Sequence, residues 1–148
     1  MPKRDRRTEK HVTGNSVFVD TSAWIALFSR RDQNHIRADR LFRAVITSKR
    51  QLFTTNLILA EIHRLLLHRA GIEAAAAALA MLEASPLVRI EFAGPAHHQS
   101  AKHWMGKLRQ HPISYTDAVS FAVLESVGCK EAMSFDHHFR PAGFSLYQ

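Results

Sequence analysis

"VFVDTSAWIALF", residues 17–28, is the stretch that decides the fold. Val17 to Asp20 is predicted to be a short strand, with three apolar residues that end in one carboxylate. Apolar residues continue at helical spacing directly after it, so we expect a helix from about Thr21 to Arg30. Functional sites of α/β domains lie beyond the carboxyl ends of parallel strands. Asp20 is therefore a candidate site residue, provided that other acids converge on the same place.

Strand-like and helix-like segments alternate over nearly all of the remaining chain. Further strands are expected at residues 51–55, 87–93, 131–135 and, as an edge strand, 144–147. Further helices are expected at about 34–49, 56–70, 72–84, 95–110 and 114–127. Strands that are separated by helices pair in parallel through crossover connections. The sequence therefore predicts a three-layer α/β/α domain with a mostly parallel sheet of four to five strands.

The charge of the chain is informative about partners. Among 148 residues, 20 Lys and Arg against 13 Asp and Glu give a formal net charge of +7. Such an excess indicates a polyanionic partner if it gathers on one face. Residues 1–15 are rich in bases and poor in apolar side chains, so we expect a disordered basic tail there, either solvated or touching phosphates, and one domain over 16–148.

The composition also bears on the compartment. Cys129 is the only cysteine, so an intrachain disulfide is excluded. No apolar run reaches the roughly 20 residues of a membrane span, and the charged N-terminus is not followed by the apolar segment of a signal peptide. We expect a cytoplasmic protein with no membrane segment.

Three further acids are candidates to meet Asp20. Glu61 has mainly apolar neighbours three and four positions away on its helix, so it is predicted to face a crevice rather than bulk water. Asp117 closes the capping box "SYTD", which can satisfy first-turn amides and still face a strand tip. Asp136 follows the strand at 131–135. An ordinary surface Glu61 and a purely capping Asp117 are the plain alternatives.

Four carboxylates in one crevice repel one another. Their repulsion either raises some of their pKa values or requires a cation. Hard divalent ions such as Mg²⁺ or Mn²⁺ are bound by oxygen ligands of this kind, together with waters. Such ions are widely used in phosphodiester hydrolysis, where they activate water and neutralise the leaving oxygen.

The chain resembles the PIN-domain nucleases, in particular the VapC-type toxins of bacterial and archaeal toxin–antitoxin pairs. The similarity runs from Val17 to about Leu146, and it is carried by "VFVDTSAWIALF", "RDQNHIRADRLF", "TTNLILAEI" and "SYTDAVSFAVLESVGCKEAMSFDHHFRPAGF", in that order. The resemblance implies that the catalytic, metal-binding acids are Asp20, Glu61, Asp117 and Asp136. It also implies that Thr21 or Ser22 orients metal-bound water.

The same resemblance implies a metal-dependent endoribonuclease that cleaves RNA, has a cognate antitoxin protein as partner and forms a homodimer. One departure concerns an additional acid that relatives often carry shortly before the "SYTDA"-like string. This chain has Arg109, Gln110 and His111 at that place. The departure favours one firmly held ion over two.

Two other functions fit some of the same residues. A PIN-like RNA-binding module with little or no turnover would agree with the missing acid. An aspartate-dependent phosphatase would use Asp20 as its nucleophile, although the second Asp that such enzymes place two residues further on is Ser22 here.

The ten histidines do not indicate zinc, because no HExxH string or Cys/His cluster is present. His137 and His138 follow Asp136 directly. We interpret them as solvated loop residues, with phosphate contact as the alternative.

Overall fold

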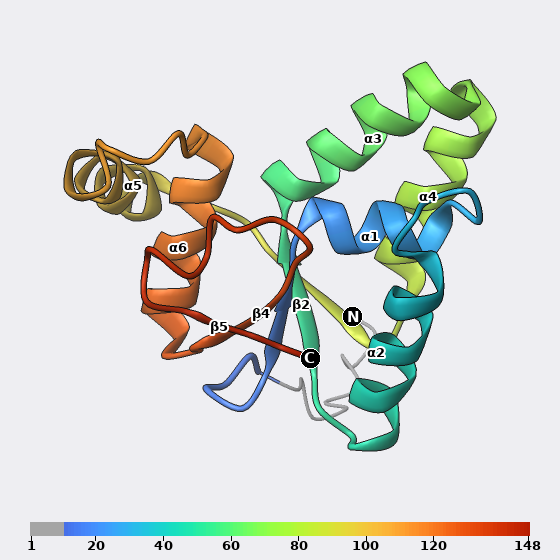
Figure 1. The fold of residues 1–148 in the computed structure, drawn as a ribbon, viewed down its shortest axis with the longest axis horizontal. Helices are drawn as coiled ribbons and strands as arrows, with labels where there is room; N and C mark the ends of the chain where they lie inside the picture. The colour runs from blue at the N-terminus through green and yellow to red at the C-terminus, as the bar shows by residue number, and fades with distance from the viewer. Residues whose placement is uncertain (1–10) are drawn as a thin grey trace, which may run out of the picture.

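The computed structural model describes residues 11–148 and contains, in that range, six helices and one five-stranded sheet (Figure 1). The strands are β1 (Val17–Val19), β2 (Leu52–Thr55), β3 (Val88–Glu91), β4 (Glu131–Met133) and β5 (Ser145–Leu146). The helices are α1 (Thr21–Phe28), α2 (His35–Thr47), α3 (Asn56–Ala70), α4 (Ile72–Ala84), α5 (Pro95–Lys107) and α6 (Tyr115–Val127). Each expected element is present.

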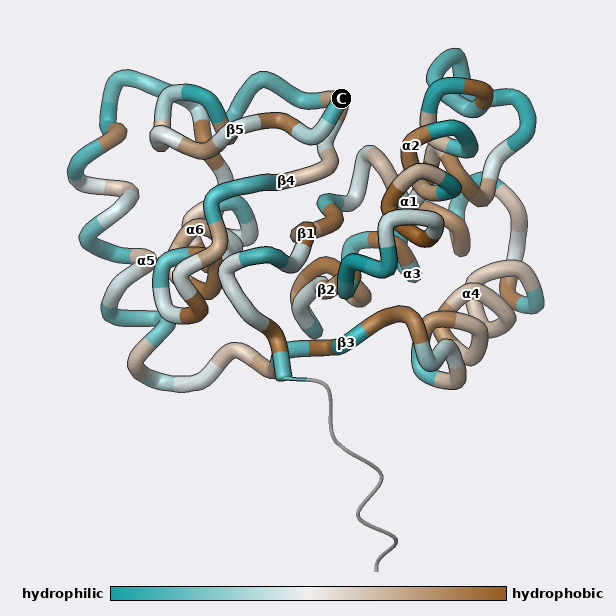
Figure 2. The backbone as a smooth tube through the Cα atoms, turned by 90° about the horizontal axis from the view of Figure 1, so that it is seen from below, coloured by the Kyte–Doolittle hydropathy of each residue, from teal (hydrophilic) through white to brown (hydrophobic). Residues whose placement is uncertain are grey.

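The sheet has the order β3-β2-β1-β4-β5, and every neighbouring pair is parallel. Helices α1 to α4 lie on one side of the sheet and α5 and α6 on the other, which gives three layers (Figures 1 and 2). The strand order reverses at β1, because β2 and β4 flank it on opposite sides. Ligand sites in such sheets lie beyond the carboxyl ends of the strands at this reversal.

The central strand β1 is buried on both faces, which explains its uninterrupted apolar sequence. Phe18 is fully buried and packs against Phe53 of β2 and against Phe139, with ring centroids 5.3 Å and 5.9 Å away. Phe121 of α6 extends this contact, since its ring lies 5.2 Å from that of Phe139. Figure 2 shows the hydrophobic strands β1 and β2 between the two helical layers.

Two strands pass directly into helices at the carboxyl end of the sheet. Asp20 is the N-cap residue between β1 and α1, and Thr55 is the N-cap residue between β2 and α3. The Thr55 hydroxyl accepts a hydrogen bond from the Ile58 amide, and the neighbouring Thr54 hydroxyl donates one to the Val19 carbonyl. These bonds fix the tips of β1 and β2 relative to each other.

Some element ends differ from the expected ones. Strand β4 ends at Met133 rather than at residue 135, and the Ser134 hydroxyl that follows it donates a hydrogen bond to Asp20. Helix α5 ends at Lys107 rather than near 110. Within residues 11–148, none of the helices is both long and apolar enough to cross a membrane.

The predicted basic tail lies mostly outside the described residues. Of its final part, Val12 packs partly buried against the core, and Arg50 donates a hydrogen bond to the carbonyl of Asn15. The division of the chain at residue 15 stays a prediction.

We expect Phe18→Ala to lower the free energy of unfolding by about 3–5 kcal/mol, because it removes the ring that joins β1 to β2 and to Phe139. The matched control is Phe92→Ala, at a residue that is 71% exposed, which should change stability by no more than about 0.5 kcal/mol. Urea unfolding followed by circular dichroism measures both. Equal losses in the two variants would contradict the assignment of Phe18 to the core.

Candidate active site

One pocket of about 480 Å³ opens at the carboxyl end of the sheet. Its lining includes the four predicted acids, each from a different part of the fold: Asp20 between β1 and α1, Glu61 in α3, Asp117 in the first turn of α6, and Asp136 after β4. Thr21 and Ser22 line the same pocket. The structure therefore brings together all six residues that the sequence singled out.

Asp20 is the most buried of these acids, with only 3% of its surface exposed. Burial and, after it, the negative charges of Asp117 and Asp136 raise the pKa of its carboxyl, which lies at about 7. A hydrogen bond from the Ser134 hydroxyl to Oδ2, 2.9 Å long, and one from the Thr21 backbone act in the opposite direction. The balance favours a protonated Asp20 below neutral pH, in the absence of a cation.

A hydroxyl network holds the strand tips around Asp20. The Ser22 and Ser134 hydroxyl oxygens lie 3.2 Å apart, and Ser22 accepts a 2.9 Å hydrogen bond from the Phe135 amide. The Asp136 amide donates to the Ser134 hydroxyl at 3.1 Å. These bonds connect the start of α1 to the turn after β4. Sequence reasoning missed Ser134, whose only signal was its place at a strand end.

Glu61 is held by Thr21 across the gap between α1 and α3. The Thr21 hydroxyl donates a 2.6 Å hydrogen bond to Glu61 Oε2. The carboxyl end of Glu61 therefore faces the pocket, as its apolar helical neighbours indicated. In this arrangement the Thr21 hydroxyl orients a carboxylate.

Asp117 has both of the roles that the sequence allowed. Its Oδ2 accepts a hydrogen bond from the Ser114 amide and its own amide donates to the Ser114 hydroxyl, so the capping box is complete. The same Oδ2 lies 2.9 Å from Nδ1 of His138, too poorly aligned for a hydrogen bond but close enough for an ion pair when the imidazole is protonated. His138 also lines the pocket and is half-buried. Its interpretation as a solvated loop residue is therefore wrong.

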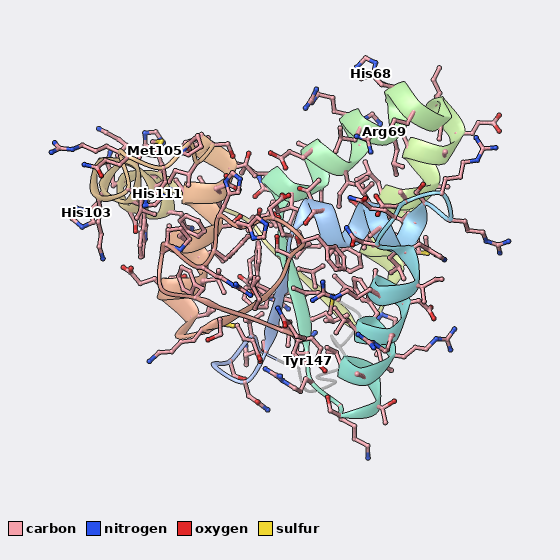
Figure 3. The ribbon with its side chains drawn as sticks, viewed as in Figure 1. His68, Arg69, His103, Met105, His111 and Tyr147 are labelled. Carbon is pink, nitrogen blue, oxygen red and sulfur yellow. The ribbon has the colours of Figure 1, made fainter. Side chains whose placement is uncertain are left out.

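Two further charged residues line the pocket and were not singled out from the sequence. Asp32, in the connection between α1 and α2, adds a fifth carboxylate. Arg69, in the last turn of α3, is the only Lys or Arg in the described lining. Figure 3 places Arg69 on α3, well away from His111, whose segment carries the departure from the family pattern. An arginine within a helical segment gives no sequence signal of its own.

The donor set of the pocket fits a hard divalent cation, because its acidic groups are all carboxylates and because burial and the charges of Asp117 and Asp136 raise the pKa of Asp20. Within residues 11–148, no three carboxylate, imidazole or thiolate groups stand close enough together to form a complete protein cage. Mg²⁺ is usually bound by one or two carboxylates, with waters completing its shell. The carboxylates of the lining could serve a partly hydrated ion of this kind.

Comparison with known proteins identifies the family of the chain. The family model for the PIN domain matches residues 17–144. The chain is 37% identical over 128 residues to the 23S rRNA-specific endonuclease VapC20 of Mycobacterium tuberculosis, with 86% of this chain and 95% of the relative covered.

Solved structures show the same similarity. The crystal structure of Mycobacterium tuberculosis VapC20, described as a sarcin–ricin loop cleaving toxin, superposes with a TM-score of 0.78 over 87% of this chain and 96% of that one. A Pyrobaculum aerophilum protein, 17% identical, superposes with a TM-score of 0.61 over 97% and 92% of the two chains and shares the fold. The predicted α/β/α fold and the predicted family are both confirmed, and this chain belongs to the PIN-domain family.

Proposed function

We propose that this protein is an endoribonuclease that hydrolyses RNA phosphodiester bonds in the pocket at the carboxyl end of its sheet. The observation that carries the proposal is the meeting of Asp20, Glu61, Asp117 and Asp136, from four separate elements, around a buried carboxyl whose pKa is raised to about 7. The similarity to a toxin described as a 23S rRNA-specific endonuclease supports it. Ribosomal RNA is accordingly the first substrate to test.

The cofactor we propose is Mg²⁺ or Mn²⁺. PIN nucleases generally use a divalent metal, and the four acids supply oxygen ligands for it. Such an ion, when bound, lowers the pKa of a water molecule and neutralises charge on the phosphate. Within the protein, Ser134 and the Thr21 backbone fix Asp20, the Thr21 hydroxyl fixes Glu61, and the capping box fixes Asp117. Preorganised ligands of this kind need little rearrangement during the reaction.

The pocket also has to admit a phosphate that is itself negative. Five carboxylates line it. The positive charges in the described lining are those of Arg69 and, when it is protonated, His138. We assign Arg69 the role of phosphate contact, because a guanidinium can bind two phosphate oxygens at once. A bound divalent ion would neutralise the remaining negative charge of the carboxylates and the phosphate.

The biological setting follows from the kinship with VapC20. We propose that the protein is the toxin of a type II toxin–antitoxin pair, acts in the cytoplasm, binds a cognate antitoxin and forms a homodimer. A short reading frame directly upstream that encodes a DNA-binding protein would support this setting.

We expect Asp20→Asn, Glu61→Gln and Asp117→Asn each to reduce the rate of cleavage by about 10- to 100-fold or more. A loss of this size is typical of disturbing a metal site. Each change keeps the shape of the side chain and removes one charge from the pocket. The control is Glu73→Gln, an exposed acid in the first turn of α4, which should cleave at the rate of the unaltered protein. The assay uses total RNA and a 23S rRNA fragment with the sarcin–ricin loop, with Mn²⁺ or EDTA, and maps the new ends.

The same assay separates the alternatives. If the RNA stays intact in Mn²⁺ and also in Mg²⁺, while a gel-shift measurement shows that it is bound, the protein is an RNA-binding module. If Asp20→Asn is inactive while the Glu61 and Asp117 variants are fully active, the proposed ligand set is wrong and a nucleophilic role for Asp20 gains support.

A second prediction concerns the stability of the metal-free protein. The pKa of Asp20 rises from 3.8 to about 7 on folding, so the folded state binds this proton more tightly than the unfolded chain does. Stability contributed by the protonated carboxyl is complete below about pH 4 and is lost as the pH rises through 7, by on the order of 4 kcal/mol. The Asp20→Asn variant has no carboxyl at this position, so it does not lose this stability as the pH rises.

In EDTA, therefore, the free energy of unfolding of Asp20→Asn relative to the unaltered protein should increase between pH 4 and pH 8. Urea unfolding at several pH values measures this difference. At pH 8, Mn²⁺ should stabilise the unaltered protein more than the variant, because binding to the native state raises stability. A difference that is independent of pH would show that Asp20 titrates as an ordinary carboxyl.

A further inference from the structure

One wall of the acid pocket is aromatic. Phe135, directly after the turn of Ser134, is half-buried and lines the pocket, and its amide donates the hydrogen bond to the Ser22 hydroxyl. The backbone of Phe135 is therefore tied to the same hydroxyl network that holds the Asp20 carboxylate. A ring in this position borders any phosphate that the pocket receives.

Arg37 of α2 covers this ring. Its guanidinium carbon lies 5.4 Å from the centroid of Phe135, within the range of a cation–π contact. Arg37 is exposed, and it makes no ion pair or hydrogen bond with any residue that the structure describes. The other exposed arginine of α2 with a defined contact, Arg43, instead pairs with Asp39 one turn away. The guanidinium of Arg37 thus lies over the ring of Phe135, and none of its donors is bonded to a residue that the structure describes.

Two amide side chains from the segment just before α2 also line the pocket. Gln33 and Asn34, in the connection that leads into α2, belong to its lining. Asn34 is the N-cap residue of α2, but its side chain makes no capping hydrogen bond. Carboxamides offer a donor and an acceptor side by side, the pattern with which proteins bind the edges of bases.

We propose that Arg37, stacked on Phe135, is a platform for one unpaired nucleobase of the RNA, next to the phosphate that the acid pocket receives. This inference rests on the proposed function and assigns a nucleobase subsite to it. Proteins that recognise RNA stack unpaired bases on aromatic rings and on arginine planes and bind their edges with polar side chains. The platform therefore selects a nucleotide that is free of base pairing beside the bond to be cut.

Stacking and charge predict different results, and this difference makes the proposal testable. A phosphate contact would strengthen the binding of strands with and without bases alike, so neither Arg37→Lys nor Arg37→Ala would change the ratio of their affinities. A stacking contact depends on the flat guanidinium, so Arg37→Lys would lose it as Arg37→Ala does. Arg40, an exposed arginine on the same helix, provides the matched control.

The probes are three fluorescein-labelled strands of equal length and charge: twelve-residue oligouridylate, twelve-residue oligoadenylate, and a twelve-residue ribose-phosphate strand without bases. Binding is measured by fluorescence anisotropy with the full chain carrying Asp20→Asn, in Mn²⁺, so that the strands stay intact. One stacked base should make the better base-bearing strand bind about 5- to 150-fold tighter than the abasic strand.

We expect Arg37→Ala, Arg37→Lys and Phe135→Leu each to reduce this ratio by at least about 5-fold, while Arg40→Ala leaves it unchanged. Urea unfolding checks that Phe135→Leu remains folded, and the two Arg37 variants test the platform without altering the buried wall. An unchanged ratio in Arg37→Ala, or full recovery in Arg37→Lys, would overturn the proposal. Base-dependent binding that requires Arg37 in a protein that cuts no RNA would support the platform and overturn the nuclease function. If the Arg37 variants cleave RNA normally and leave the affinity ratio unchanged, the platform is overturned and the nuclease function is supported.

Discussion

The constraint on which the site depends is the burial of one carboxyl group, that of Asp20, where the central strand becomes a helix. Burial of a charge is unfavourable unless a partner compensates it, and here two neighbouring carboxylates add to the penalty. The Ser134 hydroxyl and the Thr21 backbone relieve part of it, and the raised pKa shows that they do not relieve all of it. The arrangement is therefore poised either to hold a proton or to accept a cation, and the choice between them depends on pH and on the ions available.

The fold makes this burial possible. Strand β1 is central in the sheet, so its tip is enclosed by the tips of β2 and β4 and by the helices that start there. Phe18 and its aromatic neighbours fix the strand below the site, and the Thr54 hydroxyl fixes its last carbonyl. Rigid strands position the acids, whereas the flanking connections supply the residues that would recognise RNA, among them Arg37 at the start of α2 and Phe135 after β4.

Local patterns in the sequence were sufficient to predict most of the architecture. The apolar run at β1, Gly71 after α3 and the capping box at Ser114 are short-range signals, and the elements that they indicate are present. What the sequence could not show were contacts between distant segments. Ser134 reaches Asp20 across 114 positions, and His138 reaches Asp117 although loop histidines are usually solvated. The six predicted site residues line one pocket, and their roles as ligands stay a prediction until a metal or a variant tests them.

The hydrogen bond between Ser134 and Asp20 has a consequence for the stage of synthesis at which the pocket is complete. Because it joins the first strand to the fourth, the pocket exists only after the chain has been synthesised past β4, even though the first strands and helices are complete long before. A ribosome that stalls before codon 134, or a protease that removes the segment from there onward, leaves a fragment with Asp20, Glu61 and Asp117 but without Asp136 and without this closure. For a protein that acts on RNA, the pocket is therefore completed later in synthesis than most of the fold that supports it.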